Sequence, residues 1–442
     1  VAGLVFDTLY RLGTDGTVEP LIADAPPVLD EKHTTVRTAI KKGIKLHDGT
    51  ELTALDVAQS LERVRTQAKW LIAPLIGVKQ DGDAVVLSLR APVAELTTLL
   101  ALPQLAITKA GKAPGDKPIG SGPYIVDSLD RPHHHLQLRA FDDYFAGRPY
   151  VDQLVLAWYD TPDGEARRFE TGKSHISARG AAAFAGGQPT FRTDDVEGPP
   201  ALLVFVGFGR AHADVTGDRA FRRALDLALS RGGLTTISSG ERVVPTRSPV
   251  PVEAGGSALD AAGKAGDLPA ARAQLADAAK RVPSLAAAQL SRLRLEILVE
   301  DTRPDDRQLA ERVSLALDKL GIQAVITPVS ASVLRERVAK GQSDLWIGQH
   351  VAPVTARLVW WTAAFAAGAD DWSVSALGSG TIDPTAAGKE FSQRLPIVPL
   401  MFRSVRMWHP TNLRGIAFDP IGRPCYADVF VYGTPTPNRG KP

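Results

Sequence analysis

Residues 292–350 alternate between two hydrophobic periods. "LRLEILV", "IQAVITPV" and "SDLWIGQH" are predicted as strands, whereas "ASVLRERVAK" before the last of them is predicted as a helix closed by Gly341. A longer helix is predicted from about Asp305 to Leu320, because one face carries an apolar stripe ended by Gly321; the stripe comprises Leu309, Val313, Leu317 and Leu320. Strand, helix, strand, helix, strand at this spacing predicts a parallel sheet with right-handed crossovers.

Ligands of such sheets bind beyond the carboxyl ends of the strands. In "SDLWIGQH" that position belongs to Gly348, Gln349 and His350. We therefore expect Gln349 and His350 to contact a ligand.

The stretch "KLHDGTELTALDVAQSLERV" (45–64) predicts a turn at Asp48-Gly49 followed by a helix. Thr53 and Asp56 form a capping-box pattern, and the apolar positions that follow repeat at helical spacing: Val57, Leu61 and Val64. Taken alone, these features indicate scaffold.

Two further patterns lie near the middle of the chain. "ALLVFVGFGR" (201–210) is a continuous apolar run, typical of a strand buried on both faces. "DRAFRRALDLAL" (218–229) predicts a helix with Phe221, Leu225 and Leu229 on its buried stripe. A loop dense in Gly, Pro and Lys at 109–124 marks a boundary between lobes.

Length and composition narrow the class of protein. At 442 residues the chain exceeds the roughly 250–300 residues of one hydrophobic core, so two or more lobes are expected. A net charge of +2 without a long basic run argues against nucleic-acid binding, and the longest apolar runs are too short to span a bilayer. The single cysteine, Cys425, excludes an internal disulfide and a multi-thiolate metal site. The sequence starts without a leader, so we expect a signal peptide to have been removed or left out.

Several stretches together resemble the peptide/nickel-type extracellular solute-binding proteins of ATP-driven import systems, family 5. They keep the family's order over about 400 residues: "FDTLYRLGTDGTVEPLIA" (6–23), "HDGTELTALDV" (47–57), "PIGSGPYIV" (118–126), "YFAGRPYVDQLVL" (144–156), "ETGKSHIS" (170–177), "DRAFRRALDLALSR" (218–231) and "LPIVPLMF" (395–402). Each match is weak alone, and the combination is specific.

The resemblance implies an α/β fold of the two-lobed periplasmic-binding-protein type (type II), with a small extra domain in lobe one. The implied division is lobe I at 1–20, an accessory domain at 21–117, lobe I again at 118–204, lobe II at 205–394 and a return to lobe I at 395–442. The ligand would be enclosed between the lobes by hinge closure.

The chain departs from the family pattern in three places. It begins inside the pattern, without the leading strand. After "DLWIG", where peptide-binding members carry an acid that pairs with the peptide amino group, it reads "QHVAPVTA". The stretch that follows is shorter than is usual in the family and lacks the further helical segment that family members have there. A peptide with a free amino group is therefore a weak candidate for the solute.

For several other groups of residues, an ordinary structural role is the alternative to a functional one. His133, His134 and His135 invite a metal hypothesis, but in a strand only His133 and His135 would share a face, and exposed polar positions are favoured. Cys425 suits a small buried thiol better than a nucleophile. Trp346, Trp360, Trp361 and Trp372 fall where the family pattern is lost; pocket lining and core filling are equally favoured for Trp360 and Trp361. Phe208 and Arg210 follow the apolar run near the expected hinge, where Arg210 would meet an anionic group or remain a solvated charge.

The leading hypothesis is a non-catalytic solute-binding protein that delivers a small solute to a membrane permease. We expect no cofactor, no bound nucleic acid, a monomer, and a periplasmic or extracellular location with a lipid anchor left open. The predicted ligand-binding residues are Phe208, Arg210, Gln349, His350, Trp360 and Trp361. The alternatives are a cytosolic ligand-sensing domain of the same fold and a metal-assisted hydrolase using the histidine cluster.

Overall fold

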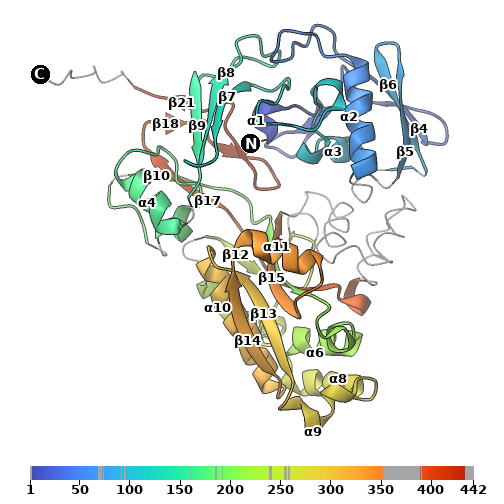
Figure 1. The fold of residues 1–442 in the computed structure, drawn as a ribbon, viewed down its shortest axis with the longest axis vertical. Helices are drawn as coiled ribbons and strands as arrows, with labels where there is room; N and C mark the ends of the chain where they lie inside the picture. The colour runs from blue at the N-terminus through green and yellow to red at the C-terminus, as the bar shows by residue number, and fades with distance from the viewer. Residues whose placement is uncertain are drawn as a thin grey trace, which may run out of the picture.

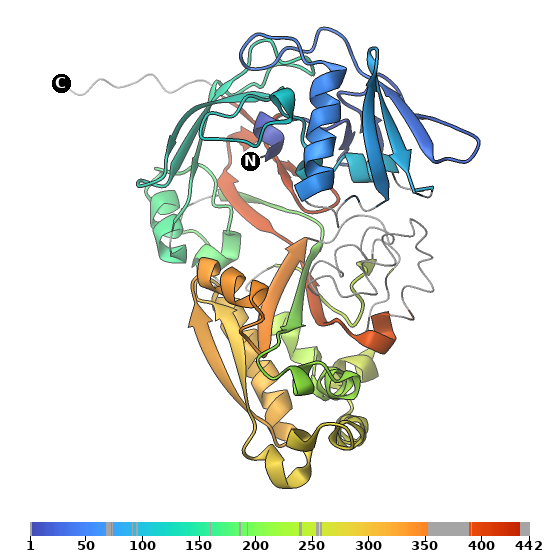
Figure 2. The ribbon, with the colours of Figure 1, turned by 45° about the vertical axis from the view of Figure 1, so that its right-hand side comes forward.

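A computed structural model describes residues 2–433 apart from 68–71, 73, 91, 94–95, 160, 185–186, 192, 238–240, 253–255, 257–258, 352–388 and 390. The chain forms two bodies joined by a narrow waist (Figures 1 and 2). The upper one holds the N-terminal half and the last strands, and the lower one holds a six-stranded sheet with its helices. Trp360, Trp361 and Trp372 lie outside the described residues.

The upper body contains a four-stranded and a three-stranded antiparallel sheet besides smaller two-stranded ones. The four-stranded sheet has the order β3-β4-β6-β5, with α2 packed against it (Figure 1), and β1 pairs with β2 alone. The elements of this part of the chain are α1 (Ala2–Val5), β1 (Tyr10–Leu12), β2 (Val18–Pro20), β3 (Val28–Leu29), β4 (Thr35–Ala39), α2 (Ala54–Gln67), β5 (Leu75–Asp81), β6 (Ala84–Leu89) and α3 (Leu96–Leu100). A three-stranded sheet follows, formed by β7 (Tyr124–Asp130), β8 (His135–Ala140) and β9 (Gln153–Ala157), and then α4 (Pro162–Glu170).

The predicted capping box begins α2. Asp56 accepts from the backbone N–H of Thr53 at 2.9 Å, and Thr53 Oγ1 accepts from the backbone N–H of Asp56 at 3.3 Å. The predicted apolar stripe of this helix is buried, at Val57, Leu61 and Val64. Asp56 also receives the backbone N–H of Ala110 at 2.7 Å, so the helix start is tied to the loop at 109–124.

His47, at the start of the same motif, also ties this part of the chain to the loop at 109–124. His47 accepts from the backbone N–H of Gly120 at 3.3 Å through Nδ1, and its Nε2 lies 2.9 Å from the carbonyl oxygen of Gly122. Gly122 is itself in close contact with the first helix, because a Cβ there would lie 2.5 Å from the backbone of Val5. The motif that runs from His47 to Asp56 therefore fastens the four-stranded part to the Gly-Pro turn.

The lower body is built on one mixed sheet with the order β12-β16-β11-β15-β13-β14. The strands β13, β14 and β15 are parallel, as predicted, whereas β11 pairs antiparallel with both β15 and β16. The elements of this body are β11 (Leu202–Phe208), α5 (Ala213–Thr216), α6 (Arg219–Ala228), β12 (Val243–Pro245), α7 (Ala261–Ala265), α8 (Leu268–Ala279), α9 (Ala287–Leu290), β13 (Arg294–Glu300), α10 (Pro304–Lys319), β14 (Gln323–Val329), α11 (Ala331–Ala339), β15 (Leu345–Val351) and β16 (Ile397–Arg403).

The predicted core stripes of the lower body are buried. Phe221 and Leu225 of α6 pack in the same cluster as the stripe of α10, and β11 is buried along its middle five residues. Gly321 follows α10 with φ +83°, a left-handed conformation that glycine adopts without strain. The helix α10 begins and ends one residue before the bounds predicted from the sequence.

The waist is a two-stranded ribbon, β10 (Thr193–Glu197) and β17 (Arg406–Pro410). The first continues through residues 198–201 into β11, and the second follows β16 after residues 404–405. The remaining strands return to the upper body: β18 (Leu413–Arg414), β19 (Ala417–Phe418), β20 (Pro424–Cys425) and β21 (Phe430–Val431).

Sheet membership changes two expected boundaries. β11 starts at Leu202, and β16, placed with lobe I in the sequence-based division at 395, lies inside the six-stranded sheet up to Arg403. The apolar run "LPIVPLMF" gave no sign of which sheet it joins. We therefore propose residues 202–403 as the second lobe and the remainder as the first lobe.

Candidate ligand-binding site

The parallel strands end at the same edge of the six-stranded sheet that carries the waist. Leu202, the first residue of β11, pairs with Val351 at the end of β15 and with Arg403 at the end of β16. Both connections between the lobes therefore leave from this edge, and the strands point toward the first lobe (Figure 2). We call it the hinge edge of the sheet.

Gln349 is held at the hinge edge by a buried carboxylate. Its Nε2 donates to Asp306 Oδ1 at 2.7 Å, and Asp306 is fully buried at the start of α10. Within the described part of the chain, Asp306 Oδ2 accepts no hydrogen bond and lies 3.5 Å from Arg303 Nη1. Burial raises the pKa of Asp306 to about 6, although the positive charge of Arg303 and the hydrogen bond from Gln349 act in the opposite direction.

Arg403 supplies a second charged group at the same edge. It donates from Nη1 to Asp305 Oδ2 at 2.9 Å, and its Nε lies 3.6 Å from Glu241. That Nε is buried and has no hydrogen-bond acceptor among the residues described. Burial also raises the pKa of Asp305. The hinge edge thus holds carboxylates and guanidinium groups whose hydrogen-bonding capacity is incompletely used.

His350 adds a neutral imidazole beside Gln349. Burial disfavours the imidazolium form and lowers its pKa to about 4. At neutral pH the ring therefore offers one donor and one acceptor rather than a positive charge.

The waist itself is locked by Glu197, the last residue of β10. Glu197 accepts from Ser404 Oγ, from the backbone N–H of Arg242 at 2.7 Å and from Arg406 Nη2 at 3.1 Å. Burial favours the neutral acid, but these hydrogen bonds prevail and hold the pKa of Glu197 below its ordinary value. One carboxylate thus joins both lobe connections to the start of β12.

Phe208 and Arg210 lie at the opposite end of the sheet. Phe208 pairs with Leu345, the first residue of β15, whereas Gln349 pairs with Val204. Arg222 lies over the Phe208 ring at 4.8 Å, and the Arg210 backbone donates to the carbonyl of Gly341 at 3.1 Å. Because β11 and β15 are antiparallel, Phe208 and Arg210 lie far from Gln349 and His350. The structure therefore does not bring these four predicted residues together in one site.

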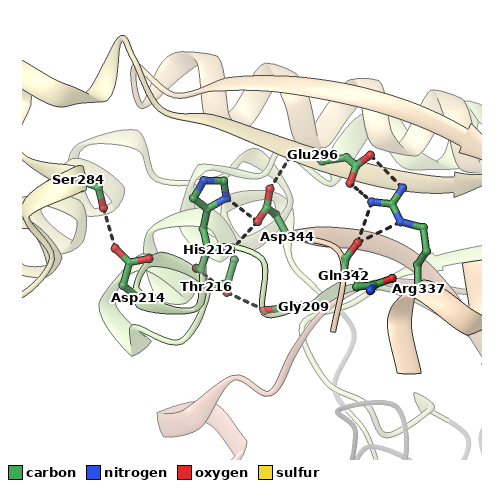
Figure 3. Close-up of polar contacts among 9 residues, drawn as sticks. All are labelled: Gly209, His212, Asp214, Thr216, Ser284, Glu296, Arg337, Gln342 and Asp344. Carbon is green, nitrogen blue, oxygen red and sulfur yellow. Dashed lines mark hydrogen bonds and ion pairs between the residues drawn. The ribbon is translucent and has the colours of Figure 1, made fainter. Parts of the chain in front are cut away.

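The residues around Asp344 at this end form a dense hydrogen-bond network (Figure 3), although the buried Ser343 Oγ has no hydrogen-bond partner among the described residues. Asp344 accepts from the His212 backbone N–H at 2.9 Å, from His212 Nδ1 at 2.8 Å and from the Glu296 backbone N–H at 2.9 Å. Arg337 binds Glu296 and the carbonyl of Gln342 beside it. This opposite end has the character of scaffold.

The histidine cluster differs from the expected strand. His133 and His134 lie in a turn, with φ +58° at His134, and only His135 belongs to β8. His133 Nδ1 lies 2.8 Å from Asp130, and His134 stacks on Trp158. In the described ranges, no group of three or more His, Cys, Asp or Glu side chains is arranged to hold a metal ion.

Cys425 is partly buried in β20, and burial raises the pKa of its thiol. A thiol held in the neutral form is a poor nucleophile.

The sequence-based prediction names Gln349 and His350, which the structure places at the hinge edge, and it does not name the charged residues there and at the waist: Asp305, Asp306, Arg403 and Glu197. The available signals were the acidic pair in "RPDDR" directly after a strand and the arginine that ends the apolar run "LPIVPLMFR". Charged residues at strand and helix ends are common on surfaces, so neither signal is specific.

Comparison with known proteins provides independent support. The model of the bacterial extracellular solute-binding proteins, family 5, middle region, matches residues 17–366. Protein XP55 of Streptomyces lividans is 28% identical over 269 residues, covering 56% of this chain and 48% of that protein. The nickel-binding protein NikA of Staphylococcus aureus is 23% identical over 239 residues, covering 52% and 46%. The chain thus spans about half the length of these curated relatives.

Solved structures match over nearly the whole chain. A dipeptide-binding protein of Pseudoalteromonas sp. SM9913 in complex with Met-Leu has a TM-score of 0.82 at 15% identity, covering 98% of this chain and 94% of that one. The binding protein AgaA of A. tumefaciens R10 in complex with agropinic acid has a TM-score of 0.79 at 18% identity, with the same coverage. These matches confirm the predicted two-lobed, type II binding-protein fold.

Proposed function

Because the chain belongs to the bacterial extracellular solute-binding proteins of family 5, we propose that it captures a small solute between its two lobes and delivers it to the permease of an ATP-driven importer. The observation that carries this proposal is the hinge edge, where polar groups gather at the point where both lobe connections cross, and where Asp306 Oδ2 and Arg403 Nε have no hydrogen-bond partner among the described residues. Lobe closure over such an edge would desolvate a solute without breaking a bond.

Location and assembly follow from the same family. We infer a periplasmic or extracellular site of action and a monomeric protein, with a lipid anchor as an untested addition. Among the described helices, none is long and apolar enough to cross a membrane. NikA, AgaA and the Pseudoalteromonas protein are described as binding proteins, which supports a non-catalytic role.

The hinge edge favours a polar solute. Asp305 and Asp306 provide carboxylates, Gln349 an amide and His350 a neutral imidazole. Similar proteins are described as binding nickel, a dipeptide and agropinic acid, so the family spans several classes of solute. Hydrogen-bonding groups rather than a large apolar surface would select the solute here.

The test is native mass spectrometry of protein purified without denaturation, followed by titration calorimetry with the solute that it identifies. We expect one small molecule bound per chain in the native spectrum and none after denaturation. Gln349→Ala should weaken binding about tenfold or more, because one hydrogen bond to a charged group is worth about 1.5–3 kcal/mol.

Gln342→Ala is the matched control. Gln342 is exposed three residues before β15, at the other end of the sheet, and among the described residues its backbone alone bonds Arg337, through both its carbonyl and its N–H, so alanine retains these bonds. Equal affinity of both variants would exclude the hinge edge as the binding site. A bare chain that captures no solute even from a mixture of peptides, opines and metal complexes would contradict the proposed function.

A further inference from the structure

Three arginines gather around one carboxylate, away from the hinge edge. Asp226, buried on α6, binds Arg231 through Oδ1 at 2.6 Å and Arg223 through Oδ2 at 3.1 Å. Arg247, two residues after β12, lies with its Nε 3.6 Å from the same Oδ1. Both carboxylate oxygens are therefore already engaged before Arg247 is considered.

Arg231 has a complete structural role. It is fully buried and donates to Asp226 and to the carbonyl oxygen of Pro399, at 3.2 Å from Nε and 2.8 Å from Nη2. The pairing of β11 with β16 shifts register between Val204 and Phe205, opposite Met401 and Pro399. A bulge of this kind leaves backbone groups of the strand without a partner in the neighbouring strand. Arg231 donates to one of them, the carbonyl oxygen of Pro399.

Arg247 has no comparable set of partners. Its Nε and Nη2 are buried, and neither donates a hydrogen bond within the part of the chain that the structure describes. Its side chain is 26% exposed in all, so part of the side chain reaches solvent while Nε and Nη2 face inward. Burial lowers the pKa of Arg231, and the positive charges of Arg247 and Arg223 add to this effect, although Asp226 opposes it.

An excess of guanidinium groups in a partly buried place is costly unless an anion joins them. Unpaired buried donors carry the full desolvation cost, and this cost is larger for charged groups. A guanidinium group presents its N–H donors in a planar fork that matches the two oxygens of a carboxylate. The neighbouring Arg223 and Arg231 would add attraction at short range.

We propose that Arg247, supported by Arg223 and Arg231, is an anion-binding residue that pairs with a carboxylate group of a small molecule. The inference rests on the proposed function in one respect, which is that the small molecule is the captured solute. The site itself requires only an accessible carboxylate.

The position of Arg247 separates this site from the hinge edge. Val243 of β12 pairs with Arg403 at the hinge edge, and Thr246 donates its backbone N–H to the carbonyl of Leu400. Arg247 therefore lies about four residues from that edge, or roughly 13 Å along the strand direction. β12 and β15 are also three strand spacings apart, about 14 Å across the sheet. Only a solute longer than either offset would place its polar end at Gln349 and its carboxylate at Arg247.

The experiment compares thermal unfolding of wild type, Arg247→Met and Arg292→Met in chloride and in succinate at equal ionic strength. Methionine keeps the stem of the side chain and removes the charge. Arg292 is the matched control because it is exposed, and only its backbone N–H is seen to bond among the residues described. The difference between variants cancels the general effect of succinate on protein surfaces.

We expect Arg247→Met to be at least as stable as wild type in chloride, since the substitution removes two buried donors that make no hydrogen bond among the described residues, and Asp226 keeps Arg223 and Arg231. Succinate should raise the Tm of wild type and of Arg292→Met by about 2–4 °C more than that of Arg247→Met. Inorganic phosphate at the same concentration should give a smaller difference, because the planar fork fits a carboxylate.

Three outcomes would overturn the proposal. Equal succinate responses in all three proteins would exclude Arg247 as the anion-binding residue. Loss of stability by Arg247→Met in both salts, with no difference in the succinate response, would show that Arg247 only supports Asp226. A response to phosphate alone would exclude a carboxylate. None of these results depends on whether native mass spectrometry finds a solute, so failure of the proposed function would be seen separately.

Discussion

The two ends of the six-stranded sheet use the same residue types in opposite ways. At the end opposite the hinge edge, Asp344 is buried and receives three N–H groups, and its neighbours Glu296 and Arg337 are paired with each other (Figure 3). At the hinge edge, Asp306 is equally buried but receives one hydrogen bond from the described residues, and Arg403 Nε has only the 3.6 Å ion pair with Glu241 among them. A completed network stabilises the fold, whereas an incomplete one has capacity left for a ligand.

The largest effect is expected from Asp344→Ala. The substitution removes a buried acceptor and leaves the backbone N–H of Glu296 without it, whereas the exposed His212 donors can turn to water, so the free energy of unfolding should fall by about 3 kcal/mol or more. Urea unfolding measures this change, and Asp318→Ala, an exposed position on α10, is the control. A loss below about 1 kcal/mol would show that the two ends do not differ in the way described.

The pH dependence of stability should distinguish the hinge edge next. Asp306 has its pKa raised to about 6, so its contribution to stability is present below the unfolded pKa near 4 and is lost as the pH rises through 6. His350 has its pKa lowered to about 4, so its contribution is present above 6.5 and is lost as the pH falls toward 4. In wild type the two slopes oppose each other between pH 4 and pH 6.

Single substitutions should expose each slope. Relative to wild type, Asp306→Asn should lose stability on acidification from pH 7 to pH 4 by up to about 3 kcal/mol, and His350→Gln should gain by a similar amount. Urea unfolding at four pH values measures both, with Asp318→Asn as the control for a surface carboxylate. Parallel curves for all four proteins would mean that neither group titrates as its burial implies.

The sequence predicted the parallel half of the sheet well because periodicity reports local burial. The stripe of α10 and its stop at Gly321 depend only on neighbours along the chain, and so does the capping box at Thr53 and Asp56. Arg403, in contrast, meets Asp305 from 98 residues away, and no local pattern encodes that contact.

Strand direction explains the division of the predicted site. Phe208 and Arg210 were expected beside Gln349 and His350 because all four follow or end apolar strands. The antiparallel register of β11 and β15 places the end of one strand against the start of the other. Direction between strands distant in sequence is set by tertiary pairing, which hydrophobic periodicity does not report.

A moderate effect is expected at the waist from Glu197→Gln. The amide can still accept from the Arg242 backbone N–H, but it loses the charge that Arg406 meets, so the free energy of unfolding should fall by about 1–2 kcal/mol. The same urea experiment measures it, with Glu19→Gln as the control, because Glu19 is exposed and its side chain pairs with Arg11 alone within the described residues. A loss no larger than that of Glu19→Gln would remove Glu197 from the lock at the waist.

The smallest effect is expected from Arg210→Ala, which tests the scaffold end directly. The Arg210 side chain is exposed, and its position is held through backbone hydrogen bonds that alanine retains. The free energy of unfolding should therefore stay within about 0.5 kcal/mol of wild type, and the affinity for the solute identified by native mass spectrometry should not change. Titration calorimetry beside Gln349→Ala measures the second quantity. A tenfold loss of affinity in Arg210→Ala would mean that the solute reaches the opposite end of the sheet, and the division between a binding end and a scaffold end would fail.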